Sequence, residues 1–161
     1  MTTLRRCIEL LDRKLIPYTH THHANAYRAR DVAAAEHLPP DKLAKTVIFC
    51  GDDFYAIAVL PADCMVDLDE LARNLGLDRI RLATETEVDR LFPDSEIGAM
   101  PPLGNLFNLP VYVDERLAEE QDIIFNAGTH RDAIQMSFAD YLHLTKPLIT
   151  RFAHAAAGVR H

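Results

Sequence analysis

The sequence has few of the residues on which several common kinds of active site depend. Its 161 residues include no tryptophan, three cysteines and only two serines, Ser95 and Ser137. Neither serine lies in a G-x-S-x-G segment and no G-x-x-x-x-G-K segment is present, which argues against a serine nucleophile elbow and a phosphate-binding P-loop. The widely spaced Cys7, Cys50 and Cys64 form no C-x-x-C pair, so we interpret them as small core residues rather than a disulfide framework or a zinc site.

Long apolar runs and excess positive charge are also missing. No stretch approaches 18 apolar residues, and the N-terminus leads into an amphipathic pattern rather than a signal peptide, so we expect a cytoplasmic protein with no membrane partner. The net charge of -7 argues against broad, non-specific nucleic-acid binding. A local basic face and ordinary solvated helix charges are equally good interpretations of Arg5, Arg6, Arg13, Lys14, Arg28 and Arg30.

The remaining composition is that of one globular domain. Apolar residues make up 48% and charged residues 25% of the chain, and no repeat or low-complexity run interrupts it. A chain of this length is long enough for one substantial core. We therefore expect a single domain over residues 1–161, with a frayed C-terminal tail from about residue 153, and a monomer.

Periodicity and turn residues predict a mixture of short helices and strands. Strands are expected at 18–22, 43–50, 54–60, 80–82, 111–113, 123–127 and 133–136. Helices are expected after Thr2 or Thr3, over 31–37, after the capping boxes at 67–70 and 84–87, after Ser137, and in the tail over 148–161. Because the strands alternate irregularly with helices and several are joined as hairpins, the fold class is α+β, with a mixed, mainly antiparallel, barrel-like sheet flanked by helices.

Three segments at strand ends or in loops are candidates for chemistry. Lys45 stands at the start of an apolar strand, although most lysines in such places are solvated surface charges. Residues 98–104 hold two glycines and two prolines, so they form a shaped loop rather than regular structure. Gly128, Thr129 and His130 form a tight turn. Glycine turns can offer backbone N–H groups to an oxyanion, a lysine can hold a phosphate, and His130 can move a proton, so the residues alone predict an anion-handling cleft.

Histidines also invite a metal interpretation. His20, His22 and His23 are the tightest group, but no carboxylate lies at ligand spacing nearby and no H-E-x-x-H segment exists. We expect neither a metal nor a cofactor.

A family resemblance joins the three candidate segments. Lys45-Thr46 entering an apolar strand, Gly98-x-x-x-Pro102 followed by Gly104, and Gly128-Thr129-His130 leading to a last helix together resemble the YbaK-like family. This family comprises aminoacyl-tRNA editing domains, including the insertion domain of bacterial prolyl-tRNA synthetase and free-standing relatives. The resemblance covers residues from about 15 to 148, and the segment Gly98 to Pro102 is its strongest element.

The resemblance implies an aminoacyl-tRNA deacylase with Lys45 and His130 as catalytic residues. Lys45 would hold the tRNA 3′ terminus or the ester carbonyl while water attacks, with help from substrate groups such as the terminal ribose hydroxyl. The implied substrate-binding residues are Thr46, Gly98, Ala99, Met100, Pro101, Pro102, Gly104, Gly128 and Thr129. The implied partners are the aminoacyl-tRNA acceptor end and a synthetase, with alanine or cysteine on the proline tRNA as the expected ester. The alternative is a non-catalytic binding or regulatory module that has kept the fold.

Overall fold

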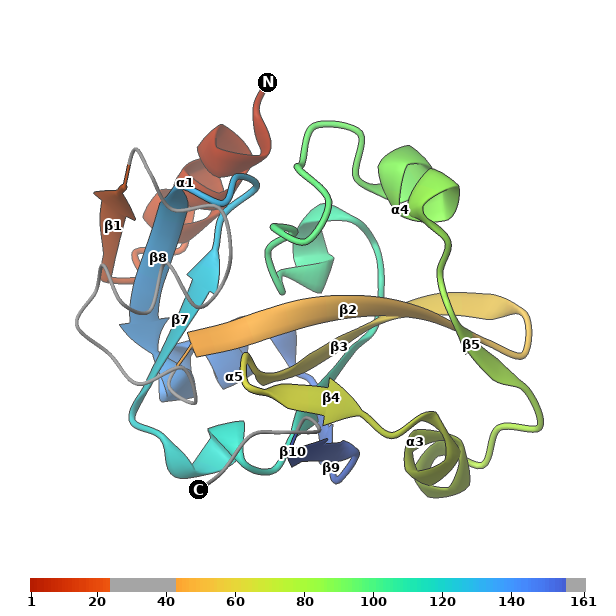
Figure 1. Cartoon of the computed structure of the whole chain (residues 1–161). Coiled ribbons are helices and arrows are strands. Elements are labelled where there is room, and N and C mark those ends of the chain that lie inside the picture. Colours follow the sequence, from red (N-terminus) through yellow and green to blue (C-terminus); the bar gives the residue numbers. More distant parts are fainter. Residues whose placement is uncertain (24–42, 156–161) are drawn as a thin grey trace.

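The computed structural model describes residues 1–23 and 43–155, and one large sheet dominates this part of the chain (Figure 1). The hydrogen-bonded order is β1-β8-β7-β2-β3-β6-β9, and β5 also pairs with β2. A second sheet consists of β4 and β10. The strand bounds are β1 Tyr18–His22, β2 Leu43–Gly51, β3 Phe54–Pro61, β4 Cys64–Val66, β5 Ile80–Leu82, β6 Val111–Asp114, β7 Asp122–Asn126, β8 Asp132–Ser137, β9 Leu148–Thr150 and β10 Ala153–Ala155.

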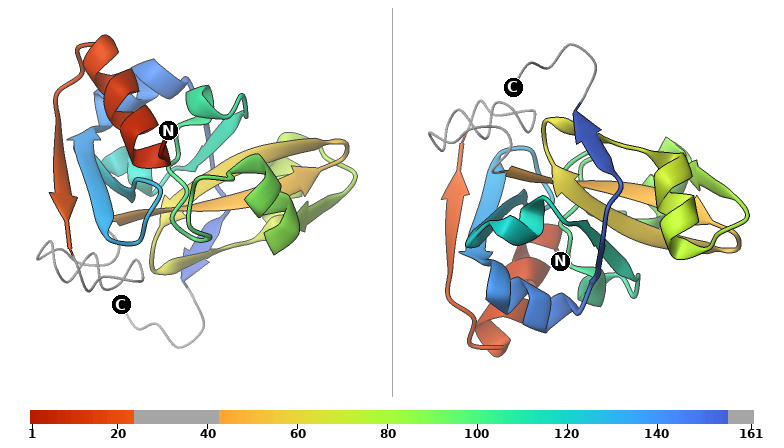
Figure 2. Two further views of the ribbon diagram at one scale, coloured as in Figure 1. Left: turned by 90° about the horizontal axis from the view of Figure 1, so that it is seen from above. Right: turned by 90° about the horizontal axis from the view of Figure 1, so that it is seen from below.

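Strand directions confirm the predicted α+β class with a mixed, mainly antiparallel sheet. The antiparallel pairs are β1 with β8, β7 with β8, β2 with β3, β2 with β5, and β4 with β10. The parallel pairs are β2 with β7, β3 with β6, and β6 with β9. The helices are α1 Thr3–Arg13, α3 Leu68–Leu75, α4 Glu85–Leu91 and α5 Phe138–Thr145, and short 3-10 helices occupy Gly104–Leu106 and Leu117–Glu119. Helices α1 and α5 lie beside β8, whereas α3 and α4 lie by the β2–β3 hairpin (Figure 2).

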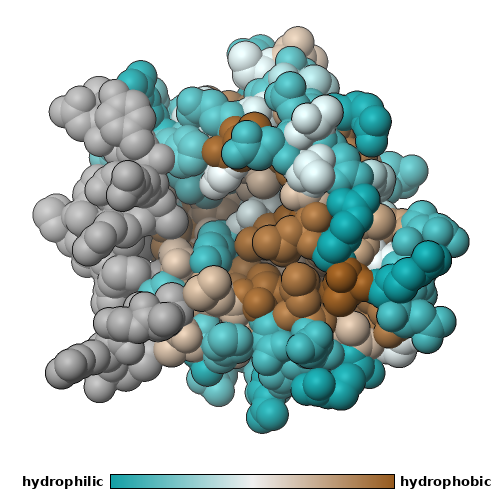
Figure 3. Space-filling model, turned by 45° about the vertical axis from the view of Figure 1, so that its right-hand side comes forward, coloured by the Kyte–Doolittle hydropathy of each residue, from teal (hydrophilic) through white to brown (hydrophobic). Residues whose placement is uncertain are grey.

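The β2–β3 hairpin is buried on both faces. Ala44 and Ile48 of β2 lie in a first core cluster that also includes residues of α1, α5 and the loop after α4. Phe49 lies in a second cluster with Leu71 of α3 and Phe152. Because neighbouring residues of a strand point to opposite faces, the even-numbered residues from 44 to 48 face the first cluster and the odd-numbered ones face the second. Apolar side chains also gather on one outer face of the molecule, where Figure 3 shows a continuous apolar area.

Helix caps follow the sequence signals closely. Thr2, Asp67, Thr84 and Ser137 each accept a hydrogen bond from a backbone N–H of the first helical turn, and Gly76 ends α3 in a left-handed conformation. At Thr84 the full capping box forms with Glu87. At Asp67 only one half forms, because the Glu70 carboxylate pairs with Arg151 at 2.7 Å instead. Leu15 continues the helical spacing of Leu4, Ile8 and Leu11, which predicts that it lies on the apolar face of the first helix, but it lies beyond α1 and is 89% exposed.

The predicted C-terminal helix is wrong. Residues 148–150 form β9 and residues 153–155 form β10, so the frayed tail expected from about residue 153 would begin at least three residues too early. The fully buried Asp114 carboxylate holds this segment extended by accepting the N–H groups of Phe152 at 2.9 Å and Ala153 at 2.7 Å. The predicted helix over 31–37 and the end of the tail lie outside the described residues. No helix in the described ranges is long and apolar enough to cross a membrane.

Candidate active site

Backbone hydrogen bonds tie the predicted loop to the predicted turn. The Glu96 N–H donates to the carbonyl of Gly128 at 2.8 Å, and the Gly128 N–H donates to the carbonyl of Ala99 at 2.8 Å. The loop follows α4 and the turn joins β7 to β8, so segments about thirty residues apart meet at one place. In Figure 1 the loop lies between the end of β7 and strand β2. Two of the three predicted segments are therefore brought together.

Gly98 and His130 form the point of contact between loop and turn. Gly98 has a φ of +88°, a backbone conformation that residues with side chains rarely adopt. A Cβ at this position would lie 3.1 Å from Nε2 of His130, so the imidazole packs directly over the glycine. Glu96 holds the other side of His130, because its carboxylate accepts the His130 N–H at 2.9 Å and lies 3.6 Å from Nδ1. The imidazole is thus positioned by contacts with the loop.

The rest of the loop is anchored in the core. Met100, Pro101 and Pro102 are buried, and the buried Tyr141 hydroxyl donates to the Pro102 carbonyl at 2.7 Å. Gly104 is required for packing, since a Cβ there would lie 2.2 Å from the Leu109 carbonyl oxygen. These contacts make the loop rigid, as its two prolines predicted. Residues 99–104 are therefore buried, and the part of the loop near Gly98 is exposed.

Several of the backbone N–H groups expected to bind an oxyanion are already hydrogen-bonded within the protein. We expected backbone N–H groups from both glycine turns to be available to an anion, but the Gly128 N–H is taken by the Ala99 carbonyl. The N–H groups of Ala99 and His130 are also taken, by the Glu96 carbonyl and the Glu96 carboxylate. Among the described residues, the Gly98 N–H has the Met100 thioether as its partner, at 3.2 Å. Because sulfur is a weak acceptor, a substrate can recruit the Gly98 N–H more easily than the N–H groups of Ala99, Gly128 and His130.

Lys45 lies on the hairpin face that carries the second core cluster. It is half-buried on β2, opposite Leu60 of β3. Burial lowers the pKa of the Lys45 ammonium, and the neighbouring Cys64 and Asp63 offset part of this shift. The next residue, Thr46, points to the opposite face, where it is 7% exposed among first-cluster residues. The side chains of Lys45 and Thr46 therefore point to opposite faces of the sheet, and the binding role of Thr46 stays a prediction.

Strand pairing links Lys45 to the turn. The parallel register of β2 and β7 places Leu43 opposite Ile124 and Ala44 opposite Phe125. The next residues along this register are Lys45 and Asn126, two positions before the turn begins at Gly128. No hydrogen bond joins Lys45 to the loop or the turn in the described part of the chain. The catalytic and binding roles of all the named residues stay predictions.

The histidines of β1 belong to a network that sequence reasoning missed. Asp132, 5% exposed, receives His20 Nε2 at 2.8 Å and His22 Nδ1 at 2.9 Å on one oxygen, and the Thr129 hydroxyl donates to the other at 2.6 Å. Burial alone would raise the pKa of Asp132, but the hydrogen bonds from Thr129, His20 and His22 outweigh it and lower the pKa. The Thr129 hydroxyl also accepts the backbone N–H of Asp132, so the network fixes the turn.

The sequence signal for this network was the i, i+2 spacing of the histidines, which gives two side chains on one strand face. The carboxylate that binds both histidines, Asp132, lies 110 residues after His22 and could be found only from the β1–β8 register. Within the described ranges, no group of three or more His, Cys, Asp or Glu side chains could hold a metal ion.

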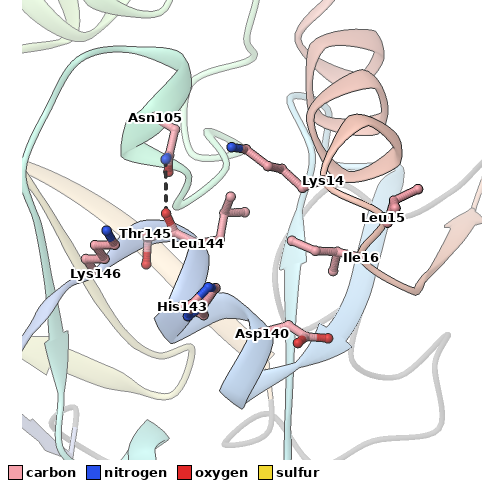
Figure 4. A pocket seen from close by; sticks show the side chains of 9 residues that line it. All are labelled: Lys14, Leu15, Ile16, Asn105, Asp140, His143, Leu144, Thr145 and Lys146. Atoms are coloured by element: carbon pink, nitrogen blue, oxygen red, sulfur yellow. Dashed lines mark hydrogen bonds between the residues drawn. The ribbon is translucent and has the colours of Figure 1, made fainter.

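A separate hollow of about 570 Å³ lies where α1 and α5 end (Figure 4). Asn105 stands at its edge and donates to the Leu144 carbonyl at 3.0 Å. None of the predicted site residues lines it, so we do not place the catalytic site there. The lining residues are Lys14, Leu15, Ile16, Asn105, Asp140, His143, Leu144, Thr145 and Lys146.

Comparisons with known proteins point to one family. The model of the aminoacyl-tRNA editing domain family matches residues 23–144. The chain is 36% identical over 107 residues to the multifunctional Ser/Thr-tRNA deacylase ProXp-y of Escherichia coli K12, which covers 66% of this chain and 64% of that protein. It is 30% identical over 124 residues to the proline–tRNA ligase of Leuconostoc citreum, covering 75% of this chain and 21% of the ligase.

A solved structure has the same fold. It is described as that of a candidate trans-editing enzyme for prolyl tRNA synthetase, and it superposes with a TM-score of 0.84 at 23% identity, covering 96% of this chain and 99% of that one. At this identity the likeness is one of fold. The chain spans less than two thirds of the length of the E. coli relative.

Proposed function

Because the chain belongs to the aminoacyl-tRNA editing domain family, whose model covers residues 23–144, we propose that it is a deacylase for mischarged aminoacyl-tRNA. The observation that supports this most is the joining of Gly98 to His130 at the end of β7. That strand pairs with the strand of Lys45, so all three segments that carry the family resemblance lie on, or next to, two paired strands, which supports the proposal. We take residues 1–161 to be one editing domain that acts as a monomer.

The proposed reaction is hydrolysis of the ester between the amino acid and the terminal ribose. Water adds to the carbonyl carbon, the bond from this carbon to the ribose oxygen breaks, and one proton of the water ends on that oxygen. The Lys45 ammonium would stabilise the negative charge on the tRNA terminus or on the carbonyl oxygen. Gly98 would add its N–H, and His130, held by Glu96, would donate a hydrogen bond or move a proton.

The choice of amino acid is the finer part of the proposal. The family resemblance implied alanine or cysteine on the proline tRNA, and that expectation stays a prediction. The E. coli relative is a Ser/Thr-tRNA deacylase, so we add seryl and threonyl esters to the proposed substrates and rank them first. A separate editing site is needed because one methylene changes the binding free energy in a synthetase pocket by only about 1–3 kcal/mol. The acceptor end of tRNA is the proposed partner, and a synthetase partner stays a prediction.

The test is a deacylation assay with purified protein on seryl-, threonyl-, alanyl- and cysteinyl-tRNA. Lys45→Ala is the inactive variant, and Lys14→Ala, which changes an exposed lysine in the distant hollow, is the matched control. We expect at least one ester to be hydrolysed by the wild type and by Lys14→Ala, and about 10²-fold more slowly by Lys45→Ala. If the folded wild type hydrolyses none of the four esters, the deacylase proposal is wrong for these substrates and the non-catalytic binding module takes its place.

A further inference from the structure

We infer that Asn126 is a specificity-determining residue, whose side-chain carbonyl accepts a hydrogen bond from the hydroxyl of a seryl or threonyl ester. This inference rests on the proposed function and names a residue that neither the motifs nor the comparisons single out. Three observations support it: the face of the sheet on which Asn126 lies, the burial of its side chain, and the hydrogen bonding of its Oδ1 and Nδ2 atoms.

Alternation along β7 places Asn126 on the same face of the sheet as Lys45. Ile123 and Phe125 point into the first core cluster, so Asn126 points to the other face. On β2 the same cluster receives Ala44, so Lys45 also points to the other face. Since Ala44 lies opposite Phe125 in parallel register, the following residues of the two strands stand beside each other.

In the described part of the chain, the side-chain oxygen of Asn126 accepts no hydrogen bond. The residue is 6% exposed, and among residues 1–23 and 43–155 its side chain makes one hydrogen bond, which Nδ2 donates to the carbonyl of Asp132 at 3.5 Å. No N–H or O–H of the described residues donates to Oδ1, and yet no described side-chain oxygen is both fully buried and unpartnered. Oδ1 therefore keeps some exposed surface. Buried polar groups are nearly always hydrogen-bonded, so an open acceptor beside a candidate catalytic lysine indicates a place for a ligand donor.

The chemistry of the neighbours selects the kind of donor. The Lys45 ammonium on the adjacent strand disfavours a second cation, so the α-ammonium of the amino acid is a poor partner for this position. A neutral amide oxygen suits a neutral hydroxyl, which donates one hydrogen bond. Alanyl and cysteinyl esters lack this hydroxyl and would leave Oδ1 without its bond. A site built to bind a hydroxyl discriminates strongly against the analogue that lacks it.

The experiment compares seryl- and alanyl-tRNA hydrolysis in the wild type and in Asn126→Leu, which keeps the size of the side chain but removes its acceptor. We expect the ratio of kcat/KM for seryl over alanyl ester to fall about tenfold or more, with alanyl hydrolysis changed less than threefold. Asn126→Asp, which keeps an acceptor oxygen, should retain more of the preference. Equal losses for the two esters, or an unchanged ratio, would overturn the assignment.

Gln135→Leu is the matched control. Gln135 lies on the same face, opposite Ile124 of β7, but its amide is already bound to the Asp122 carboxylate at 3.1 Å. This variant should leave the ester ratio unchanged.

A binding measurement separates this inference from the proposed function. Non-hydrolysable amide analogues, with serine or alanine joined to 3′-amino-3′-deoxyadenosine, are titrated into the wild type and Asn126→Leu. A preference for the seryl analogue in the wild type that disappears in Asn126→Leu supports the role of Asn126 even if no ester is hydrolysed. Equal affinity of the wild type for both analogues overturns it even if deacylation occurs.

Discussion

Replacing Gly98 with alanine adds one methyl group where the loop meets His130. The backbone there has a φ of +88°, and a left-handed conformation costs a residue with a Cβ about 1–2 kcal/mol. The new Cβ would lie 3.1 Å from Nε2 and 3.7 Å from Cε1 of the imidazole. Both contacts are to the tip of a half-buried ring, which can turn away, so the stability cost comes mainly from the backbone and the ring is displaced by a fraction of an ångström.

Gly76→Ala isolates the backbone cost. Gly76 ends α3 at a φ of +68°, and a Cβ there would meet nothing within 4 Å. Both alanine variants should therefore lose about 1–2 kcal/mol, which corresponds to a decrease in Tm of about 2–8 °C for a domain of this size. Only Gly98→Ala should lose deacylation activity, by about tenfold or more, because small misplacements of a reacting group are costly.

The assay is single-turnover deacylation at matched fractions of folded protein. A double-mutant cycle with His130→Ala completes it, since Gly98→Ala should cost little further activity once the imidazole is gone. If Gly98→Ala is as active as Gly76→Ala, the loop does not position His130 for the reaction and the reasoning fails.

Three further predictions concern stability and charge. Lys45→Met should slow deacylation about 10²-fold yet leave Tm unchanged or higher, because burial lowers the folded-state pKa of Lys45. The charge of Lys45 then destabilises the fold at pH values below that pKa, and this penalty decreases as pH rises from the folded-state pKa to the higher pKa of the unfolded chain. A marked loss of Tm would show that Lys45 is structural. Asp114→Ala should lower the free energy of unfolding in urea by about 3–5 kcal/mol, because it leaves backbone N–H groups of the C-terminal segment buried and unpaired. The control Glu115→Ala, at an exposed position, should lower it by less than about 0.5 kcal/mol. Equal losses in the two variants would contradict this role of Asp114. Tyr141→Phe should cost about 1–3 kcal/mol by removing the bond to the Pro102 carbonyl, and an unchanged urea midpoint would show that the loop does not depend on it.

Features with local signals were predictable from the sequence. The caps at Thr2, Thr84 and Ser137, the left-handed end at Gly76, and the irregular loop at 98–104 are encoded within a few residues of where they occur. The opposite orientation of Lys45 and Thr46 was also available, because side chains alternate along any strand.

Features set by distant partners were not predictable. Residues 148–155 contain apolar residues that suit a helix as well as a strand, and the choice is made by Asp114, 38 residues before Phe152. No local sequence pattern identifies Asp132 as the partner of His20, because their contact depends on which strand pairs with β1. Asn126 likewise gains its candidate role only from the parallel register with β2.

The β2–β3 hairpin, which carries Lys45, packs against a separate apolar cluster on each of its two faces. Its amide hydrogens can meet solvent only if packing on both sides is lost, so they should exchange with deuterium at the rate set by global unfolding. The turn at 128–130 is held by a few hydrogen bonds and can open locally at lower free energy. Lys45 thus lies on the part of the molecule that should open last, whereas His130 lies on a turn that should open earlier.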